Sequence, residues 1–397
     1  MGGWPQLTFD VVAQLKDRGH KVLVMTSRHQ RERITSPEDG VQRVFHLQSP
    51  DRDFYHPHYA LLERWHEFEN QRFLKQSIFD FLPDFIFIHG LWNMSRRVAL
   101  DAERYLPTKV VYYIASLWPI EMDAHISYWS TPTRRTWMRL PKKAISFFVQ
   151  KALLSGSASR TPRFDRVLCV SKYIQNRMID QVGVSPQHTD VIYNGVDTKV
   201  FSPQAIHRAD GGHLKMIYAG GFWEHKGVLS ALDAIDHLIN RLGIRNIHLS
   251  LVGAGHPEYV AHMKRRIRQT QIESYVSFRE RVPRERMPEL LRSYDVLVFP
   301  STGPEALPRI VQEAMACGLL VIGSTAGGTP EILHDGVNGL SFEAGDSKML
   351  AEKIALAASD PRLRKRLASA ARGTVEEQFS IEIMVNKVEE YFASLMV

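Results

Sequence analysis

Two glutamates, Glu305 and Glu313, are the residues of this chain whose type and spacing are best suited to bind a ligand rich in hydroxyl groups. Glu305 follows the apolar run 296–299, which predicts a buried strand, and Glu313 lies in a helix predicted over 310–317. Pro308 suits the first position of that helix because its missing N–H does no harm there. The free N–H groups at the helix start predict an anion-binding site, and a diphosphate is the ligand that we expect there.

A pair of carboxylates is also what a glycoside hydrolase uses. Eight residues of helix would separate Glu305 from Glu313 by about 12 Å. The carboxyl groups of such hydrolases lie only about 5 to 9.5 Å apart. The spacing therefore disfavours hydrolysis and favours two hydrogen-bond acceptors for hydroxyls at different points of one elongated ligand.

Lys226 follows a predicted strand and lies at the start of the next helix, where its ammonium group could neutralise a phosphate. Gly253 and Gly255 follow the next predicted strand and resemble half of a dinucleotide-binding fingerprint. Because Glu258 takes the place of the third glycine, we do not expect a nicotinamide cofactor.

Two histidines, His56 and His58, stand beside Asp51 and Asp53 and could ligate a metal. They lie in an irregular stretch with two prolines, and such ligands without a regular scaffold usually form only a loop. We therefore predict that the protein has no metal site and requires no cation.

Short apolar runs alternate with helical stretches along the whole chain, which is typical of parallel sheets covered by helices. The predicted strands cover residues 21–26, 85–89, 109–114, 166–170, 189–192, 216–219, 248–252, 276–278, 296–299 and 320–323. The clearest helices are predicted at 8–18, 59–81 and 172–182. The pattern predicts an α/β protein with two doubly wound, Rossmann-like domains.

The order of six motifs resembles glycosyltransferase family 4, the glycosyl transferases group 1, whose members have the GT-B fold of two such domains facing across a cleft. The motifs are Tyr193–Asp197, His225–Gly227, Leu251–Gly255, Glu305 to Glu313, Gly327–Ile332 and Asp335–Leu340. The resemblance implies an acceptor-side domain over 1–200, a linker over 201–213, a nucleotide-sugar domain over 214–376 and a C-terminal helix, 377–397, that packs back toward the first domain.

The resemblance also implies a role for individual residues. Glu305 would bind hydroxyls of the transferred sugar, and Glu313 would bind the ribose of the nucleotide. Lys226 would neutralise the leaving diphosphate, helped by the backbone N–H groups of Leu307 and Arg309. Backbone and loop contacts to the base, the phosphates and the acceptor would come from Gly253, Gly255, Arg281, Val282, Gly2 and Gly3.

The sequence departs from the family pattern in three places. An arginine is usual where Gly221 stands, and Arg309 is the candidate that would replace this diphosphate cation. A histidine is common where residues 115–116 stand, and His89, at the end of an earlier predicted strand, could take its catalytic place or simply pack against Trp92. The first domain also lacks the apolar strand that should precede its glycine loop, and we expect that upstream coding sequence, if it exists, would supply this strand and raise solubility and activity.

The formal net charge of +7 suggests anionic partners. Between Arg134 and Arg166 there are nine basic residues and one acidic residue, interleaved with apolar ones. We favour a helix packed on its own domain with a solvated basic face. Contact of this basic amphipathic segment with an anionic membrane surface stays open as the alternative. A nucleic-acid partner is not expected.

No apolar run approaches the roughly 18 to 20 residues that span a bilayer. The first residues do not resemble a signal peptide, and Cys169 and Cys317 lie in apolar contexts that suit buried thiols. We therefore expect a cytoplasmic protein, and a peripheral position at the inner face of the membrane stays open.

The sequence thus predicts transfer of a hexose from a nucleoside diphosphate sugar to a hydroxyl of a glycan or lipid-linked acceptor of the cell envelope. The anomeric configuration would be retained, and no cofactor other than the donor substrate would be needed. Two alternatives stay open, an epimerase of nucleotide sugars with the same architecture and a non-catalytic homologue that binds a nucleotide sugar or a glycan.

Overall fold

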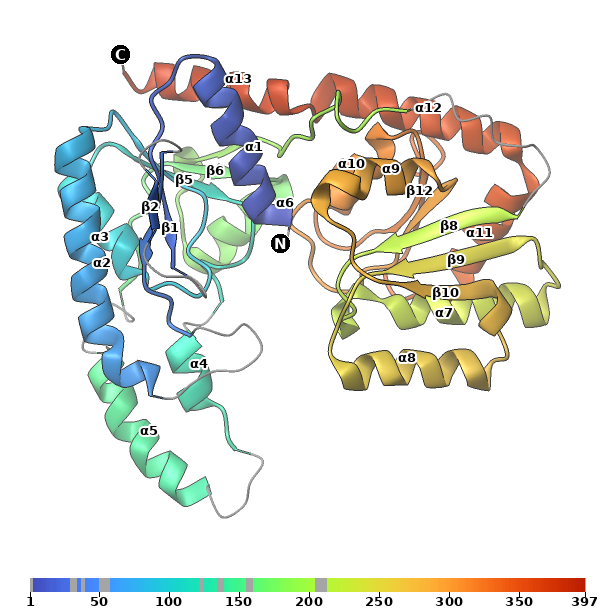
Figure 1. Ribbon diagram of the computed structural model, residues 1–397, viewed down its shortest axis with the longest axis horizontal. Coiled ribbons are helices and arrows are strands. Elements are labelled where there is room, and N and C mark those ends of the chain that lie inside the picture. The colour runs from blue at the N-terminus through green and yellow to red at the C-terminus, as the bar shows by residue number, and fades with distance from the viewer. Residues whose placement is uncertain are drawn as a thin grey trace. The chain divides into compact units, whose positions relative to one another are not determined.

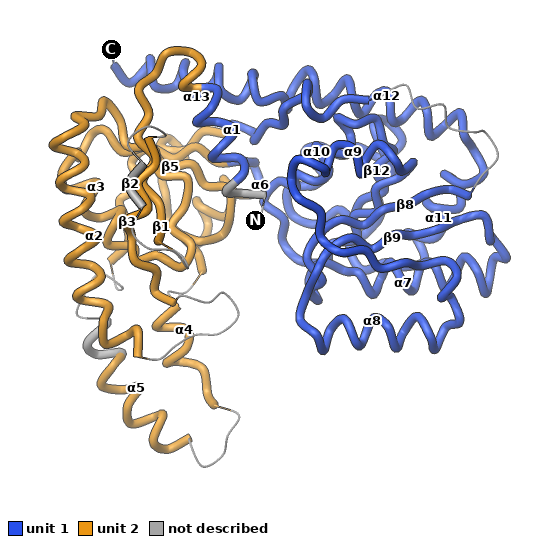
Figure 2. Tube along the Cα trace, viewed as in Figure 1, with its two compact units in different colours: residues 1–14, 170–173, 192–397 blue, residues 15–169, 174–191 orange. Residues whose placement is uncertain are grey.

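The computed structural model describes residues 3–28, 34–36, 40–49, 58–121, 124–133, 139–154, 160–203 and 213–396. The chain forms two compact units (Figure 2). Unit 1 contains residues 1–14, 170–173 and 192–397, and unit 2 contains residues 15–169 and 174–191. This division differs from the predicted ranges because the start of the chain groups with its second half.

Unit 1 is built on a parallel sheet with the strand order β10-β9-β8-β11-β12-β13 (Figure 1). Its strands are β8 (Leu214–Ala219), β9 (Ile247–Val252), β10 (Val276–Arg279), β11 (Val296–Phe299), β12 (Leu320–Ser324) and β13 (Leu340–Phe342). The chain adds strands on one side of β8 and then returns to add β11 on its other side. In open sheets of this kind, ligands bind beyond the carboxyl ends of the strands at the point where the order reverses.

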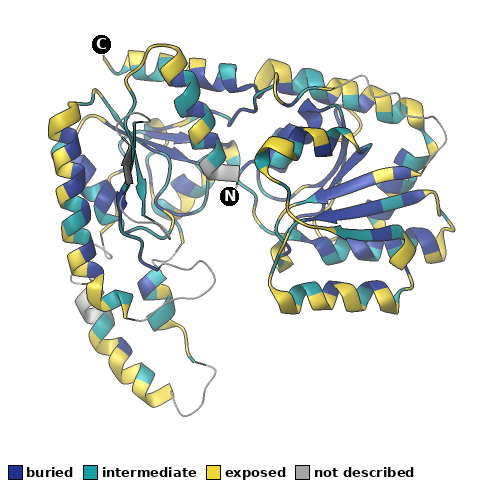
Figure 3. Cartoon of the chain, viewed as in Figure 1, coloured by how far each residue is buried: buried dark blue, intermediate teal, exposed yellow. Residues whose placement is uncertain are grey.

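The helices of unit 1 bury regularly spaced apolar residues. They are α7 (Val228–Asp236), α8 (Pro257–Gln269), α9 (Met287–Arg292), α10 (Arg309–Ala316), α11 (Ser347–Ser359), α12 (Pro361–Gln378) and α13 (Ile381–Ser394). In α7, residues Val228, Leu232 and Ile235 fall on one helical face and are fully buried. They share a core with alternate residues of β8 and β9, and Figure 3 shows this sheet as the most buried part of the unit.

Unit 2 contains two sheets. A parallel sheet has the order β4-β5-β6-β7, and a smaller sheet has the order β1-β3-β2. The strands are β1 (Val24–Ser27), β2 (Ile34–Ser36), β3 (Val41–Phe45), β4 (Ile86–Ile88), β5 (Val110–Ile114), β6 (Val167–Cys169) and β7 (Thr189–Val191). The helices are α2 (Tyr59–Phe81), α3 (Arg97–Tyr105), α4 (Ala124–Ser130) and α5 (Arg139–Leu154), and α6 (Lys172–Arg177) begins in unit 1.

Every predicted strand is present with bounds that shift by a few residues, and the helix predicted over 59–81 has those bounds. The helix predicted over 172–182 consists of α6 and a π-helical turn, Met178–Val182. The first described element is α1 (Gly3–Asp17), a helix and not a strand. Cys169 and Cys317 are free and buried, as predicted, and burial raises the pKa of each thiol to about 12.

Candidate functional site

Lys226 and Glu305 lie on the loops that follow β8 and β11, the two strands between which the strand order reverses. The ammonium nitrogen of Lys226 is 2.6 Å from Oε1 of Glu305. The hydroxyl of Ser301 donates to the same oxygen at 2.5 Å. Two donors therefore fix Oε1, whereas Oε2 has no hydrogen-bond partner among the described residues and can accept from a ligand hydroxyl.

Backbone contacts hold these two loops together. The carbonyl of His225 accepts hydrogen bonds from the N–H groups of residues 302 and 303, both at 2.9 Å. Gly227 has a φ of +67°, and a Cβ there would lie 1.8 Å from the carbonyl oxygen of Pro300. Only glycine allows this approach, so the glycine beside Lys226 brings the lysine within reach of Glu305.

The sequence placed Lys226 at a helix start, and the structure corrects this detail. Lys226 ends a 3-10 turn, Glu224–Lys226, and α7 begins after Gly227. The ammonium group is therefore held by the paired loops and not by the first turn of a helix.

Glu313 is buried in α10, with 4% of its side chain exposed. Arg284 donates to its Oε1 at 2.5 Å, and Nε of Arg309 lies 3.6 Å from the same oxygen. As in Glu305, the cations gather on one oxygen, and the other has no partner in the described part of the chain. Arg284 was not predicted from the sequence, because its loop bears no motif and only the fold brings it to Glu313.

Arg309 was the candidate for a second diphosphate cation. In the structure, its guanidinium group binds other groups of unit 1. Its guanidinium is 7% exposed and lies 2.7 Å from the carboxylate of Asp10 in α1. A further nitrogen is 3.4 Å from the carbonyl of Gly195. The side chain thus joins α10 to α1 and to the loop after β7. The backbone N–H groups of Leu307 and Arg309 donate to no described residue, as expected at a helix start.

The start of α10 also changes the spacing argument against a hydrolase. Pro308 has a ψ of 110° and is the residue before the helix, not its first residue. Only the segment from Arg309 to Glu313 is helical, so the rise of about 12 Å for eight helical residues does not apply. The helical spacing therefore gives no argument against a hydrolase.

The two predicted glycines after β9 are required by close packing. A Cβ at Gly253 would lie 1.8 Å from the carbonyl oxygen of Gly220, and one at Gly255 would lie 2.1 Å from that of Phe222. The loops after β8 and β9 therefore meet backbone to backbone. Arg281 and Val282 lie in the loop after β10, with Arg281 exposed and Val282 half-buried.

Gly221 occupies the place where the family usually has an arginine. A Cβ there would meet the indole nitrogen of Trp223 at 2.5 Å. The Trp223 ring thus lies close beside the glycine, and a longer side chain would displace it. The hydroxyl of Tyr218 also donates to the Gly221 carbonyl at 2.7 Å, which fixes this backbone.

Some predicted positions are placed elsewhere or cannot be placed. Gly3 begins α1, whereas Gly2, Asp51, Asp53 and His56 lie outside the described residues. His58 precedes α2 and its ring contacts that of Tyr59. No group of three or more metal-ligating side chains occurs among the residues that the structure describes.

His89 follows β4 in unit 2 and contacts aromatic rings. Its imidazole centroid lies 4.4 Å from that of Phe87 and 5.3 Å from that of Tyr113. Burial lowers the pKa of His89 to about 4. The imidazole is therefore neutral at physiological pH, and a catalytic role for it stays a prediction.

Unit 2 should lose stability in mild acid because its folded state holds two histidines neutral. Burial, and then the neighbouring His46, lower the pKa of His66 to about 4, and burial does the same for His89. An unfolded histidine has a pKa of about 6.5, so the unfolded state binds more protons as the pH falls from about 6.5 toward 4. We expect urea midpoints to fall through this window and the fall to be smaller in His66→Phe and His89→Phe variants. A midpoint that does not change with pH would contradict this.

Each unit contains a parallel sheet, which defines a doubly wound class of α/β protein. In unit 1, Lys226, Glu305 and Glu313 lie in the segments that follow the strands, where proteins of this class bind their ligands. The family described as Glycosyltransferase Family 4 matches residues 1–200. A second family, described as Glycosyl transferases group 1, matches residues 203–374. The chain therefore belongs to glycosyltransferase family 4.

Several known proteins are similar to this chain. An uncharacterised glycosyltransferase of Methanocaldococcus jannaschii is 29% identical over 238 residues, which cover 59% of this chain and 61% of the relative. The N-acetyl-alpha-D-glucosaminyl L-malate synthase of Bacillus anthracis is 27% identical, over 52% of this chain and 53% of that protein. The aligned regions thus span about half to three fifths of these relatives' lengths.

Solved structures share the GT-B fold over nearly the whole chain. A glycosyltransferase from Rickettsia africae has a TM-score of 0.71 at 17% identity, covering 98% of this chain and 94% of that one. Anabaena HepE in complex with UDP has a TM-score of 0.69 at 19% identity, covering 99% and 96%. At these identities the likeness establishes the fold.

Proposed function

We propose that this protein transfers a hexose from a nucleoside diphosphate sugar to a hydroxyl group, with retention of the anomeric configuration and without a metal. The observation that carries the proposal is the pair formed by Lys226 and Glu305 at the point where the strand order reverses. It places a cation for phosphate beside a carboxylate oxygen for sugar hydroxyls. Glu313 supplies a second acceptor for the ribose.

The chemistry asked of these residues is positioning and electrostatic stabilisation. Negative charge grows on the diphosphate as the glycosidic bond breaks, and Lys226 with the N–H groups at the start of α10 would stabilise it. Glu305 would orient the sugar. The acceptor hydroxyl would attack the anomeric carbon from the face that the diphosphate leaves, and its proton would pass to an oxygen of the departing diphosphate. Without a donor, Lys226 pairs with Glu305. When the donor binds, the ammonium group of Lys226 would interact with the diphosphate as well.

The relatives support a nucleotide-sugar donor. Solved structures of Anabaena HepE contain UDP, UDP with glucose, or UDP-glucose. A Corynebacterium glutamicum relative is described as a GDP-mannose-dependent mannosyltransferase of a phosphatidylinositol monomannoside. We infer a donor of this chemical class and a glycan or lipid-linked acceptor.

A nucleotide screen tests the donor site directly. We expect one of UDP, GDP or ADP to raise the thermal midpoint of the protein, since a ligand bound only by the folded state stabilises it. Glu313→Ala should abolish this rise because the ribose would lose its acceptor, whereas Glu352→Ala on α11 should keep it. No rise with any nucleotide, or a rise that Glu313→Ala leaves unchanged, would contradict the proposed site.

We also propose that α5 contacts an anionic membrane surface. Four of its apolar side chains, Leu140, Ile145, Phe147 and Phe148, are more than half exposed. Figure 3 shows this helix as largely exposed. The helix contains four basic residues and no acidic one. The helix also contacts its own domain, because Lys142 lies over the ring of Tyr128 in α4 and donates to the carbonyl of Thr131. Nowhere in the described chain does a helix have the length and apolar character needed to cross a membrane.

Vesicle sedimentation tests the membrane proposal. We expect the protein to sediment with phosphatidylglycerol vesicles and the double variant Phe147→Ser/Phe148→Ser to lose about tenfold or more in partitioning, because two exposed aromatic rings no longer enter the interface. The control Phe9→Ser/Val337→Ser removes two equally exposed apolar side chains of unit 1 and should sediment normally. Equal loss in both variants, or no binding by the unaltered protein, would refute the proposal.

A further inference from the structure

One face of the sheet in unit 1 is polar where β8, β9 and β10 lie side by side. In β9, Ile247, Leu249 and Leu251 are fully buried and share the core with α7 and α8. The alternate residues, His248 and Ser250, point to the opposite face. Strands covered by helices on both faces are apolar throughout, whereas this alternation is typical of a sheet with one face open to water.

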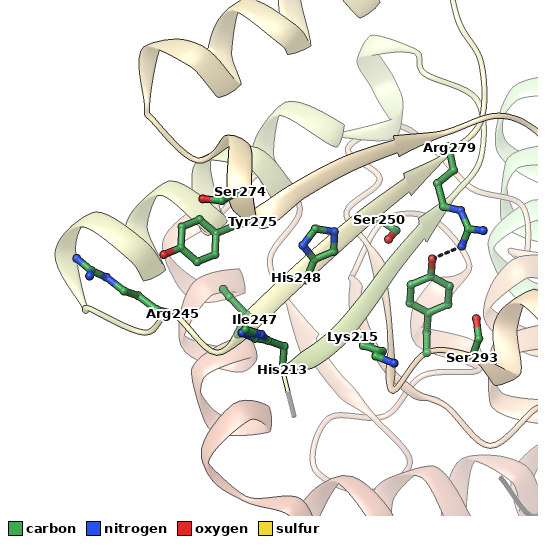
Figure 4. Close-up of a pocket in the computed structure, with 11 residues that line it drawn as sticks. His213, Lys215, Arg245, Ile247, His248, Ser250, Ser274, Tyr275, Arg279 and Ser293 are labelled. Carbon is green, nitrogen blue, oxygen red and sulfur yellow. Dashed lines mark hydrogen bonds between the residues drawn. The ribbon is translucent and has the colours of Figure 1, made fainter. Parts of the chain in front are cut away.

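A cavity of about 700 Å³ lies on this polar face (Figure 4). Its lining includes five basic side chains and no acidic one: His213, Lys215, Arg245, His248 and Arg279. Figure 4 shows Arg245 and Arg279 at opposite ends, with His248 and Lys215 between them. The cavity is thus elongated and has cationic groups along its length.

The cavity is separate from the site around Lys226 and Glu305. Most of its lining comes from residues at or just before the starts of β8 to β11, such as Lys215, Arg245, Tyr275 and Tyr294. In a parallel sheet all these amino ends lie along one edge. The loops that carry Lys226 and Glu305 follow the carboxyl ends, at the opposite edge. Arg279 is the exception, because it ends β10, so the cavity runs from the amino edge along the polar face of the sheet. Its lining includes neither Lys226 nor Glu305, and we treat it as a second site of unit 1.

The cations of the cavity are not neutralised by the protein. Lys215, Arg245 and Arg279 form no ion pair with an acidic residue of the described chain. Arg279 instead donates to the hydroxyl of Tyr294 at 2.9 Å, which aims its guanidinium across the face. The carboxylate of Asp295 accepts from the backbone N–H of Lys215 at 2.9 Å, so one acidic group lies beside the cavity. The lysine and two arginines of the lining outnumber it, and this excess of positive charge favours the binding of an anion.

Hydroxyl groups add donors between the cations. The Ser250 hydroxyl is nearly buried and lies 3.2 Å from that of Ser277, which in turn lies 2.9 Å from Nε2 of His248. A carboxylate has two acceptor oxygens, whereas a phosphoryl group offers three and up to two negative charges. The number of donors and their spread along the cavity match several phosphoryl groups better than one carboxylate.

We propose that this cavity is a second ligand site that binds a small molecule carrying two or more phosphoryl groups. Arg245 and Arg279 would hold its ends, and Lys215 with the serine hydroxyls would hold its middle. The site is distinct from the donor site and would regulate the protein or tether a phosphorylated ligand to unit 1.

Calorimetric titration of the full chain with inorganic tripolyphosphate at low salt tests the proposal. We expect saturable binding that weakens as salt is added, and an affinity lower by roughly tenfold or more in Lys215→Ala/Arg245→Ala. The control Arg265→Ala/Arg268→Ala removes the same charge from the exposed face of α8 and should bind as tightly as the unaltered protein. Lys226→Ala should keep this binding, because that lysine belongs to the other site.

Three outcomes would overturn the proposal. An equal loss of affinity in the α8 control would mean that only net charge matters. A loss in Lys226→Ala without one in Lys215→Ala/Arg245→Ala would place tripolyphosphate in the donor site. Binding of citrate as tightly as tripolyphosphate would show that the cavity does not select phosphoryl groups. Circular dichroism melts of all variants exclude unfolding as the cause.

Discussion

Replacing Lys226 with alanine should lower turnover by about 10²-fold or more. In the folded protein its ammonium group is 2.6 Å from Glu305, beside the place where the leaving diphosphate is expected. Removing one preorganised charge that stabilises growing negative charge typically costs about 10² to 10³ in kcat. Glu305→Ala should have an effect of similar size, because the sugar would lose its acceptor and Lys226 its partner.

The matched variants separate chemistry from folding. Lys226→Arg keeps the charge and should recover part of the rate, and Glu305→Gln keeps the shape while removing the charge. Initial rates at saturating donor measure the effect on kcat, and a nucleotide-binding titration shows whether the site still forms. Near-normal rates for Lys226→Ala or Glu305→Ala would remove both residues from the mechanism.

Replacing Arg309 with leucine should destabilise unit 1 by about 3 kcal/mol. The guanidinium is 7% exposed and bridges Asp10 in α1 and Glu313 in α10. Removing one partner of a buried ion pair leaves the other charges desolvated and typically costs about 3 to 5 kcal/mol. Because Arg284 still pairs with Glu313, we expect the lower end of this range.

Urea unfolding of Arg309→Leu measures this cost, and the double variant Asp10→Leu/Arg309→Leu should recover part of it because no carboxylate is then left unpaired. Arg268→Leu on the exposed face of α8 is the control and should change stability by no more than about 0.5 kcal/mol. A loss below about 1 kcal/mol in Arg309→Leu would mean that the bridge adds little to the fold.

Much of the fold was predictable because its strands are apolar and its connections alternate with helices. The strands that escaped prediction lack that signal. β3 contains Gln42 and Arg43 among its five residues, β2 has one apolar residue, Ile34, and β13 has a serine between its two apolar residues. Their strand conformation depends on pairing with neighbours that are distant along the chain, which no local pattern records.

The site was predictable where the residues form a motif and not where only the fold brings them together. Glu305, Glu313 and Lys226 stand in ordered motifs, and the structure places Lys226 beside Glu305. Ser301 and Arg284, which fix the two carboxylates, carry no sequence signal of their own. Arg309 was expected to face a ligand, and its partner Asp10 lies 299 residues away in sequence.

The structure gives a steric reason for glycine at several positions near the site. Gly227 and Gly255 were part of motifs, and the structure shows that a side chain at either would collide with backbone of the neighbouring loop. Gly221 was noted as a departure from the family, and here the adjacent Trp223 ring supplies the reason. The proposed donor site would therefore lack the cation that the family pattern has at this position.

Proton NMR of the reaction product tests the central claim most directly. The protein would be incubated with the sugar form of the nucleotide that stabilises it and with a panel of glycoside acceptors. Retention predicts a new glycoside that forms only when an acceptor is present. Its anomeric coupling constant should show that the anomeric carbon has the same configuration as in the donor. A product of opposite configuration, an epimerised donor without acceptor, or nucleotide binding with no turnover for any acceptor would contradict the account.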